Sequence, residues 1–250
     1  MSRVIYLNHN GAMLAPGASD SRIDTSELVK TTSYIPGWDA TPEQWSEMVS
    51  FTRSIWSAYD VEVTDVDPGS RPHIEVLIGG SALDIGLSRP VGGFAPVVPC
   101  SVIENAIVFA FTENLGGPEY IAEVAAQEVG HAYGLDHEYL RGELMSYSAP
   151  HVGKTFRDVD APCGENEPRA CAGGCRPHQN SHKVLLELLG SSAIGHRDQG
   201  DDASELAEFP SEDATDLDQA AVGCSAGSPS LAMLLLFAAM RRRSPNARMR

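Results

Sequence analysis

The run AAQEVGHAYGLDHEYL, in the middle of the chain, constrains its fold more than any other stretch. Helical residues four positions apart project from the same side of a helix, so Gln127 and His131 can face one ion, with Glu128 beside them. Gly134 permits the left-handed conformation that ends a helix, after which the chain can bring His137 back toward the same point. The run therefore predicts a helix whose end carries three ligand-type side chains and one carboxylate.

These residue types suit a catalytic zinc ion. Catalytic zinc sites use three protein ligands and leave one position for a water molecule, whose pKa falls to about 7. In such a site Glu128 would accept the proton of that water and then donate it to the leaving amine. Zinc is thus the predicted cofactor, and a peptide or protein is the predicted substrate.

The string E-V-G-H-A-Y-G-L-D-H resembles the motif of the metzincin clan of zinc endopeptidases, with Glu128, His131, Gly134 and His137 at motif positions. The full pattern H-E-x-x-H-x-x-G-x-x-H would name a zinc protease. This chain has Gln127 where the pattern has its first histidine. The resemblance implies that Gln127, His131 and His137 are the metal ligands and that Glu128 is the general base.

A second segment, GELMSYS, resembles the Met-turn of the same clan. The resemblance places Met145 beneath the metal and makes Tyr147 a catalytic residue that assists the metal or the transition state. The order of expected elements also resembles the upper subdomain of the clan: a strand, a helix, four strands and the active-site helix. The likeness covers roughly residues 1–190.

Gln127 weakens the expected metal site without changing its charge, because carboxamide and imidazole are both neutral ligands. An amide oxygen suits zinc less well than an imidazole nitrogen, so zinc affinity should fall. Asp136 and His151 are the two alternative replacements for the lost ligand. Three functions follow: a zinc-dependent endopeptidase, an inactive pseudoprotease that binds peptides or a partner, and a purely structural surface protein.

Local signals give the expected fold class, which is α+β: a twisted mixed sheet of about five strands with an active-site helix, a backing helix and a C-terminal helix. The backing helix is TPEQWSEMVSFTRSIWSAYD, where Thr41, Pro42 and Gln44 form an N-cap, first-turn proline and capping box. The expected strands are RVIYLNHNG, VEVTDV, HIEVLIGG, GFAPVV and NAIVFAF. We expect GFAPVV at the sheet edge, since its proline lacks an N–H, and QNSHKVLLELLG as the last helix.

The domain plan has three parts: a metallopeptidase-like domain over 1–190, an acidic disordered linker over 191–222, and a sorting or membrane segment over 223–250. The linker is poor in the apolar residues that would offset its ordering entropy. The last part has an apolar run before an arginine cluster, as in a short membrane segment with its arginines in the cytoplasm. Cys224 before this run resembles the anchoring position of myxobacterial C-terminal sorting tags.

The formal charge of -16 argues against nucleic acid as a partner, because binding to phosphates rests on Lys and Arg. Four of the five cysteines (Cys100, Cys163, Cys171, Cys175) fall in the expected domain. They predict two disulfides and an exported, surface or extracellular monomer; zinc binding by Cys163, Cys171 and Cys175 is the alternative. No export signal opens the chain as given, so export requires one upstream, unless the disulfide interpretation is wrong.

Overall fold

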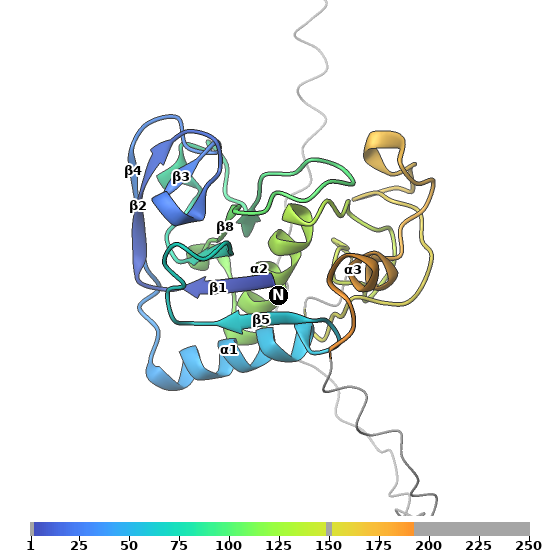
Figure 1. Ribbon diagram of the computed structural model, residues 1–250, viewed down its shortest axis with the longest axis horizontal. Coiled ribbons are helices and arrows are strands. Elements are labelled where there is room, and N and C mark those ends of the chain that lie inside the picture. Colours follow the sequence, from blue (N-terminus) through green and yellow to red (C-terminus); the bar gives the residue numbers. More distant parts are fainter. Residues whose placement is uncertain (1–2, 149–151, 193–250) are drawn as a thin grey trace, which may run out of the picture. The chain divides into compact units, whose positions relative to one another are not determined.

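The computed structural model describes residues 3–148 and 152–192. Within these ranges it has the predicted α+β fold, with three α-helices and a mixed five-stranded sheet (Figure 1). The strand order in the sheet is β5 (Val61–Thr64), β1 (Arg3–Asn8), β6 (Ile74–Ile78), β8 (Ile107–Ala110) and β7 (Gly93–Phe94). The first four strands are parallel, and β7 runs antiparallel to β8 at the edge.

The edge strand is shorter than predicted. Only Gly93 and Phe94 of the expected strand GFAPVV pair with β8. Pro96 has no N–H to contribute to a ladder, so the pairing ends before it. The edge position was predicted correctly, and its length was not.

The three α-helices are α1 (Pro42–Trp56), α2 (Pro118–Ala132) and α3 (Ser181–Leu189). The N-cap of α1 is as predicted: the Gln44 N–H donates to the Thr41 hydroxyl, and the Gln44 side chain accepts from the Thr41 N–H. Asn180 caps α3 by accepting from the Lys183 N–H at 2.9 Å. Local sequence therefore sets where these two helices begin.

One face of the sheet is covered by α1 and α2. Val76 and Val108 of the sheet join Met48 of α1 and Ile121 of α2 in one buried cluster. In Figure 1, α2 lies behind the sheet and α1 runs along its lower margin. Because β6 is also buried along its whole length, the sheet must be covered on both faces.

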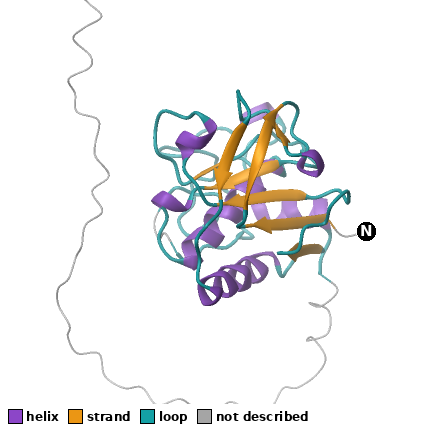
Figure 2. Cartoon of the chain, turned by 90° about the vertical axis from the view of Figure 1, so that its left-hand side faces the viewer, coloured by secondary structure: helices purple, strands orange, loops and turns teal. Residues whose placement is uncertain are grey.

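The other face is covered by a second, three-stranded sheet that the sequence did not predict. Its order is β3 (Thr25–Ser26), β2 (Gly11–Pro16) and β4 (Ser33–Pro36). Leu14 and Ile35 from this sheet pack with Leu77 and Phe109 from the main sheet. Figure 2 shows the two sets of strands running in different directions. Four short 3-10 helices complete the described elements: Ser21–Ile23, Ala82–Ile85, Thr112–Asn114 and Ala172–Gly174.

Four cysteines form the two predicted disulfides. Cys100 pairs with Cys175, and Cys163 pairs with Cys171. The alternative, in which these cysteines bind zinc as thiolates, is therefore wrong. Disulfides are typical of proteins in oxidising compartments, so the pairing indicates an exported or extracellular protein.

No helix in 3–148 or 152–192 is long and apolar enough to cross a membrane. The predicted membrane segment over 223–250, with Cys224, lies outside the described residues. The same holds for nearly all of the predicted linker over 191–222.

Candidate metal centre

The helix α2 passes through the core and delivers the motif residues at its C-terminal end. Pro118 at its first position suits a helix start, and its alanines allow close packing against the sheet and α1. The helix ends as predicted, because Gly134 adopts φ +80. A Cβ on Gly134 would lie 2.6 Å from the backbone nitrogen of Ser101, so space as well as conformation requires glycine here.

The turn after Gly134 brings His137 back onto His131. Their Nε2 atoms lie 3.0 Å apart, and the ring planes cross at 84°. Two nitrogen ligands of one tetrahedral zinc ion at 2.0–2.1 Å would lie about 3.3 Å apart. The two rings therefore have the spacing of a pair of ligands to one metal ion.

The Nδ1 atoms of both histidines face acceptors. Nδ1 of His131 lies 2.9 Å from the carbonyl oxygen of Leu135, and Nδ1 of His137 lies 3.0 Å from Oε1 of Glu165. A carbonyl or carboxylate oxygen can only accept, so each Nδ1 carries a hydrogen. In neutral rings each Nε2 then has a free lone pair, and two such lone pairs at 3.0 Å repel unless a proton or a metal ion lies between them.

Burial, with a smaller contribution from His137, lowers the pKa of His131 to about 4. His131 is therefore neutral near pH 7, which is the state that ligates metals. The pair thus fits a zinc ion in spacing and tautomer.

Glu128 is buried and packs against the edge strand. A Cβ on Gly93 would overlap its carboxylate, so only glycine leaves room for that carboxylate here. Burial raises the pKa of Glu128 to about 8. Glu128 lines a cavity of about 480 Å³ together with Phe94, Val124 and Tyr147.

Gln127 lies one helical turn before His131 and lines the same cavity. Its Nε2 atom is buried and has no hydrogen-bond partner among the described residues. Rotation of the glutamine amide by half a turn exchanges its oxygen and its nitrogen. The Gln127 oxygen can therefore occupy the position of this Nε2 atom. An unsatisfied buried polar atom costs about 1–3 kcal/mol, which a bound ion or water molecule would offset.

Met145 and Tyr147 both lie at the motif, as the Met-turn resemblance implies. The backbone of Met145 accepts from the Glu138 N–H at 3.0 Å, next to His137. The Tyr147 ring centroid lies 4.4 Å from that of His137. Burial, and then the charge of Glu128, raises the pKa of Tyr147, so its hydroxyl stays protonated near pH 7.

The two alternative third ligands are not supported. Asp136 accepts from two nitrogens of the Arg169 guanidinium, at 2.6 and 2.9 Å, and from the Ala172 N–H at 2.8 Å. Its carboxylate is thus held by other partners. His151 lies outside the described residues.

Among the described residues, two groups of three side chains each have their ligand-type atoms within 4.8 Å of one another. Asp136 belongs to both groups. The first adds Cys163 and Cys171, which are joined in a disulfide and offer no thiolate. The second adds His137 and Glu165, whose Nδ1 and Oε1 atoms already face each other. We therefore place the candidate metal at the two Nε2 atoms instead.

Two residues of this site were not predicted from the sequence. Glu165 contacts His137, and Arg169 contacts both Glu165 and Asp136. Both lie in the segment between Cys163 and Cys171. The close spacing of these two cysteines was the only signal, and it does not indicate which side chains reach the motif.

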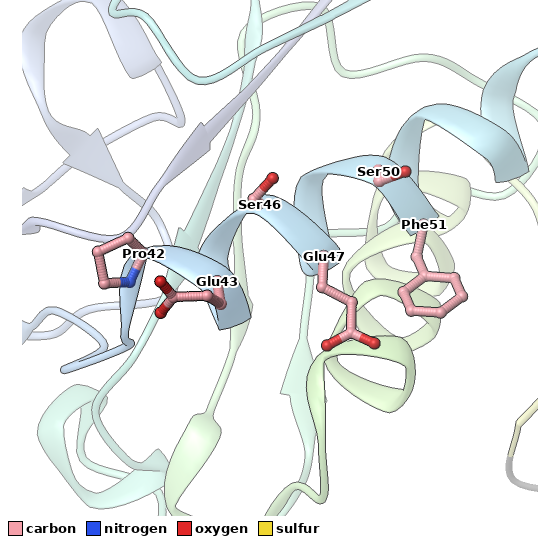
Figure 3. Close-up of a pocket in the computed structure, with 6 residues that line it drawn as sticks. All are labelled: Pro42, Glu43, Ser46, Glu47, Ser50 and Phe51. Atoms are coloured by element: carbon pink, nitrogen blue, oxygen red, sulfur yellow. The ribbon is translucent and has the colours of Figure 1, made fainter.

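A hollow of about 710 Å³ lies along the outer side of α1. Figure 3 shows its lining side chains, all from this one helix: Pro42, Glu43, Ser46, Glu47, Ser50 and Phe51. No histidine or cysteine is among them. His131 and His137 line another cavity, of about 220 Å³, together with Leu135 and Glu165.

Comparisons with known proteins give little further information. No family model and no curated protein matches the chain. Among solved structures, the chain is similar to myroilysin at 14% identity and a TM-score of 0.28; the match covers 56% of this chain and 50% of the other. It is also similar to the GM1-bound form of the ECX AB5 holotoxin, at 12% identity and a TM-score of 0.27, over 74% of this chain and 70% of the other. The chain thus spans half the length of myroilysin.

Proposed function

We propose that the chain is a zinc-dependent endopeptidase. The proposal rests on one observation: the Nε2 atoms of His131 and His137 lie 3.0 Å apart, with each Nδ1 held by an acceptor. A proton or a metal ion between the two nitrogens would stabilise this arrangement, and we propose a zinc ion. Gln127, one turn earlier on α2, would supply the third ligand through its amide oxygen.

A zinc ion held by these residues would polarise a peptide carbonyl and acidify a water molecule. The positive charge of the ion would favour the ionised form of Glu128, which would take up the proton of that water and deliver it to the leaving amine. Gly93 leaves the space beside β7 that the carboxylate occupies. Tyr147, beside His137, would donate a hydrogen bond to the developing oxyanion.

The edge strand offers a way to bind a peptide in extended form. β7 pairs only with β8 among the described strands, so a peptide could add to its other edge as a further strand. Phe94 of β7 lines the same cavity as Glu128, so a peptide on this edge would pass the carboxylate. The substrate would thus be an unfolded or extended protein segment.

The competing proposal is a pseudoprotease that binds such a segment without cutting it. Gln127 favours this alternative, because an amide oxygen is a weak zinc ligand. We also propose that the domain is exported and held at the cell surface by the segment that follows it, with Cys224 as the anchoring position. The disulfides support export but say nothing about anchoring.

Hydrolysis of an unfolded protein by the full chain, loaded with one equivalent of zinc, tests the proposal. The wild type should cleave, and Glu128→Gln should bind zinc equally well but cleave at least about 100-fold more slowly, since general acid–base catalysis contributes that much. Glu119→Gln, in the first turn of the same helix, is the matched control and should cleave as the wild type does. Zinc binding without cleavage in the wild type would instead support the pseudoprotease.

A further inference from the structure

We propose that Glu165 is a positioning residue for His137, and that the loop closed by the Cys163–Cys171 disulfide exists to present it. The inference rests on the metal site of the proposed function and not on hydrolysis. It assigns a role to a segment that lies 28 residues beyond the motif histidine.

The first step is the bond between the two side chains. Oε1 of Glu165 lies 3.0 Å from Nδ1 of His137. A carboxylate at this nitrogen fixes the tautomer, fixes the orientation of the ring about its bond to Cβ, and makes Nε2 more basic. Nδ1 of His131 faces the backbone carbonyl of Leu135 instead, so His137 is the one of the two histidines with a carboxylate partner.

The second step is the ion pair that holds Glu165. Arg169 pairs with Glu165 and, through the same guanidinium, with Asp136. Nη2 of Arg169 lies 2.8 Å from Oε1 of Glu165 and 2.9 Å from Oδ1 of Asp136. Since Asp136 directly precedes His137, one guanidinium ties Glu165 to the backbone that carries the ligand.

The third step is the loop itself. Its disulfide joins residues only eight apart, with Cα atoms at 4.9 Å. The Gly164 N–H donates to the carbonyl of His137 at 2.9 Å, so the residue before Glu165 also contacts the ligand. The Arg169 N–H donates to the carbonyl of Cys163 at 2.6 Å, which closes the loop at its other end. Backbone and side-chain bonds thus place Glu165 from both sides.

The exposure of Glu165 separates a positioning role from a stabilising one. The Glu165 side chain is 35% exposed, so its bond to His137 adds little to the stability of the fold. Losing a partner that orients a metal ligand typically lowers metal affinity by about 10 to 100-fold. A role in stability and a role in positioning therefore predict different results.

Zinc affinity of the full chain, measured by competition with a chromogenic chelator, tests the proposal. Glu165→Ala should weaken zinc binding by about 10 to 100-fold. Glu165→Gln keeps an acceptor at Nδ1 and should recover part of this loss. Glu167→Gln, an exposed change in the same loop, should bind zinc as the wild type does. All variants should keep the wild-type midpoint of unfolding. Equal zinc affinity in Glu165→Ala and the wild type would overturn the proposal.

Nitrogen NMR of the histidine rings separates this proposal from the proposed function. In the metal-free wild type, His137 should carry its hydrogen on Nδ1, and Glu165→Ala should lose this preference while Glu165→Gln keeps it. Absence of zinc binding in the wild type would count against the endopeptidase, and the ring spectra would still decide the role of Glu165. An unchanged tautomer in Glu165→Ala would overturn that role.

Discussion

The thioether sulfur of Met145 lies against Gly130, the residue before His131: a Cβ on Gly130 would be 2.6 Å from that sulfur. Met145 is fully buried, so the sulfur has little room to move away. Glycine in the middle of a helix costs about 1 kcal/mol relative to alanine, and this contact gives the physical reason for it here. Met145 thus supports the turn of α2 that carries the first histidine.

We expect Gly130→Ala to lower the free energy of unfolding in urea. Overpacking costs about 1–3 kcal/mol, which exceeds the gain of about 1 kcal/mol in helix propensity. Adding Met145→Ala should relieve the overlap, so the two changes together should be less harmful than their sum. Gly117→Ala, at the start of the same helix where a Cβ meets nothing within 4 Å, is the control. Strictly additive effects would show that the contact is unimportant.

Glu75 makes the stability of the fold depend on pH. It is 3% exposed and accepts from Nδ2 of Asn8 at 2.8 Å, and it has no ion pair among the described residues. Burial raises its pKa from 4.5 to about 7. Between these values the folded chain keeps a proton that the unfolded chain has lost, so the free energy of unfolding falls as pH rises through this window.

The expected loss is about 3 kcal/mol between pH 4.5 and pH 7, since each unit of pKa corresponds to about 1.4 kcal/mol. Glu75→Gln keeps an acceptor for Asn8 and should make the free energy of unfolding nearly independent of pH between 4.5 and 7. Glu62→Gln, whose wild-type carboxylate pairs with Arg71 at the surface, should leave the slope unchanged. Equal slopes for Glu75→Gln and the wild type in urea unfolding from pH 4.5 to 7 would contradict the assignment.

The two disulfides should separate stability from metal binding. Cys100–Cys175 spans 75 residues and Cys163–Cys171 spans eight. Chain entropy then assigns about 4.5 kcal/mol to the first and about 2.5 kcal/mol to the second. Replacing the short-range pair by serines should therefore cost less stability.

The same pair holds the loop that presents Glu165, so its replacement should cost more zinc affinity. Urea unfolding of the two double-serine variants measures the loss of stability, and chelator competition measures the loss of zinc affinity. The two losses should rank the variants in opposite order. The account would be contradicted if the Cys163→Ser/Cys171→Ser variant bound zinc more tightly than the Cys100→Ser/Cys175→Ser variant.

Sequence alone predicted the elements whose signals are local. The capping box at Thr41 and Gln44 set the start of α1, and Gly134 set the end of α2. The meeting of His131 and His137 was also predictable, because helix periodicity and one turn determine it.

The second sheet and the partner of His137 depend on distant contacts, and the sequence predicted neither. The second sheet consists of short strands that are partly exposed, and only packing on Leu77 and Phe109 explains why they form. Glu165 reaches His137 because a disulfide and Arg169 place it there. No pattern near His137 indicates such a partner.

The central claim is that Gln127, His131 and His137 together bind one zinc ion. Mass spectrometry of the full chain, purified without added metal, measures this directly, beside Gln127→His and His131→Ala. The account predicts close to one zinc per chain in the wild type and in Gln127→His, and none in His131→Ala. Zinc in Gln127→His but not in the wild type would contradict it, and the cleft would then belong to a protein that binds peptides without a metal.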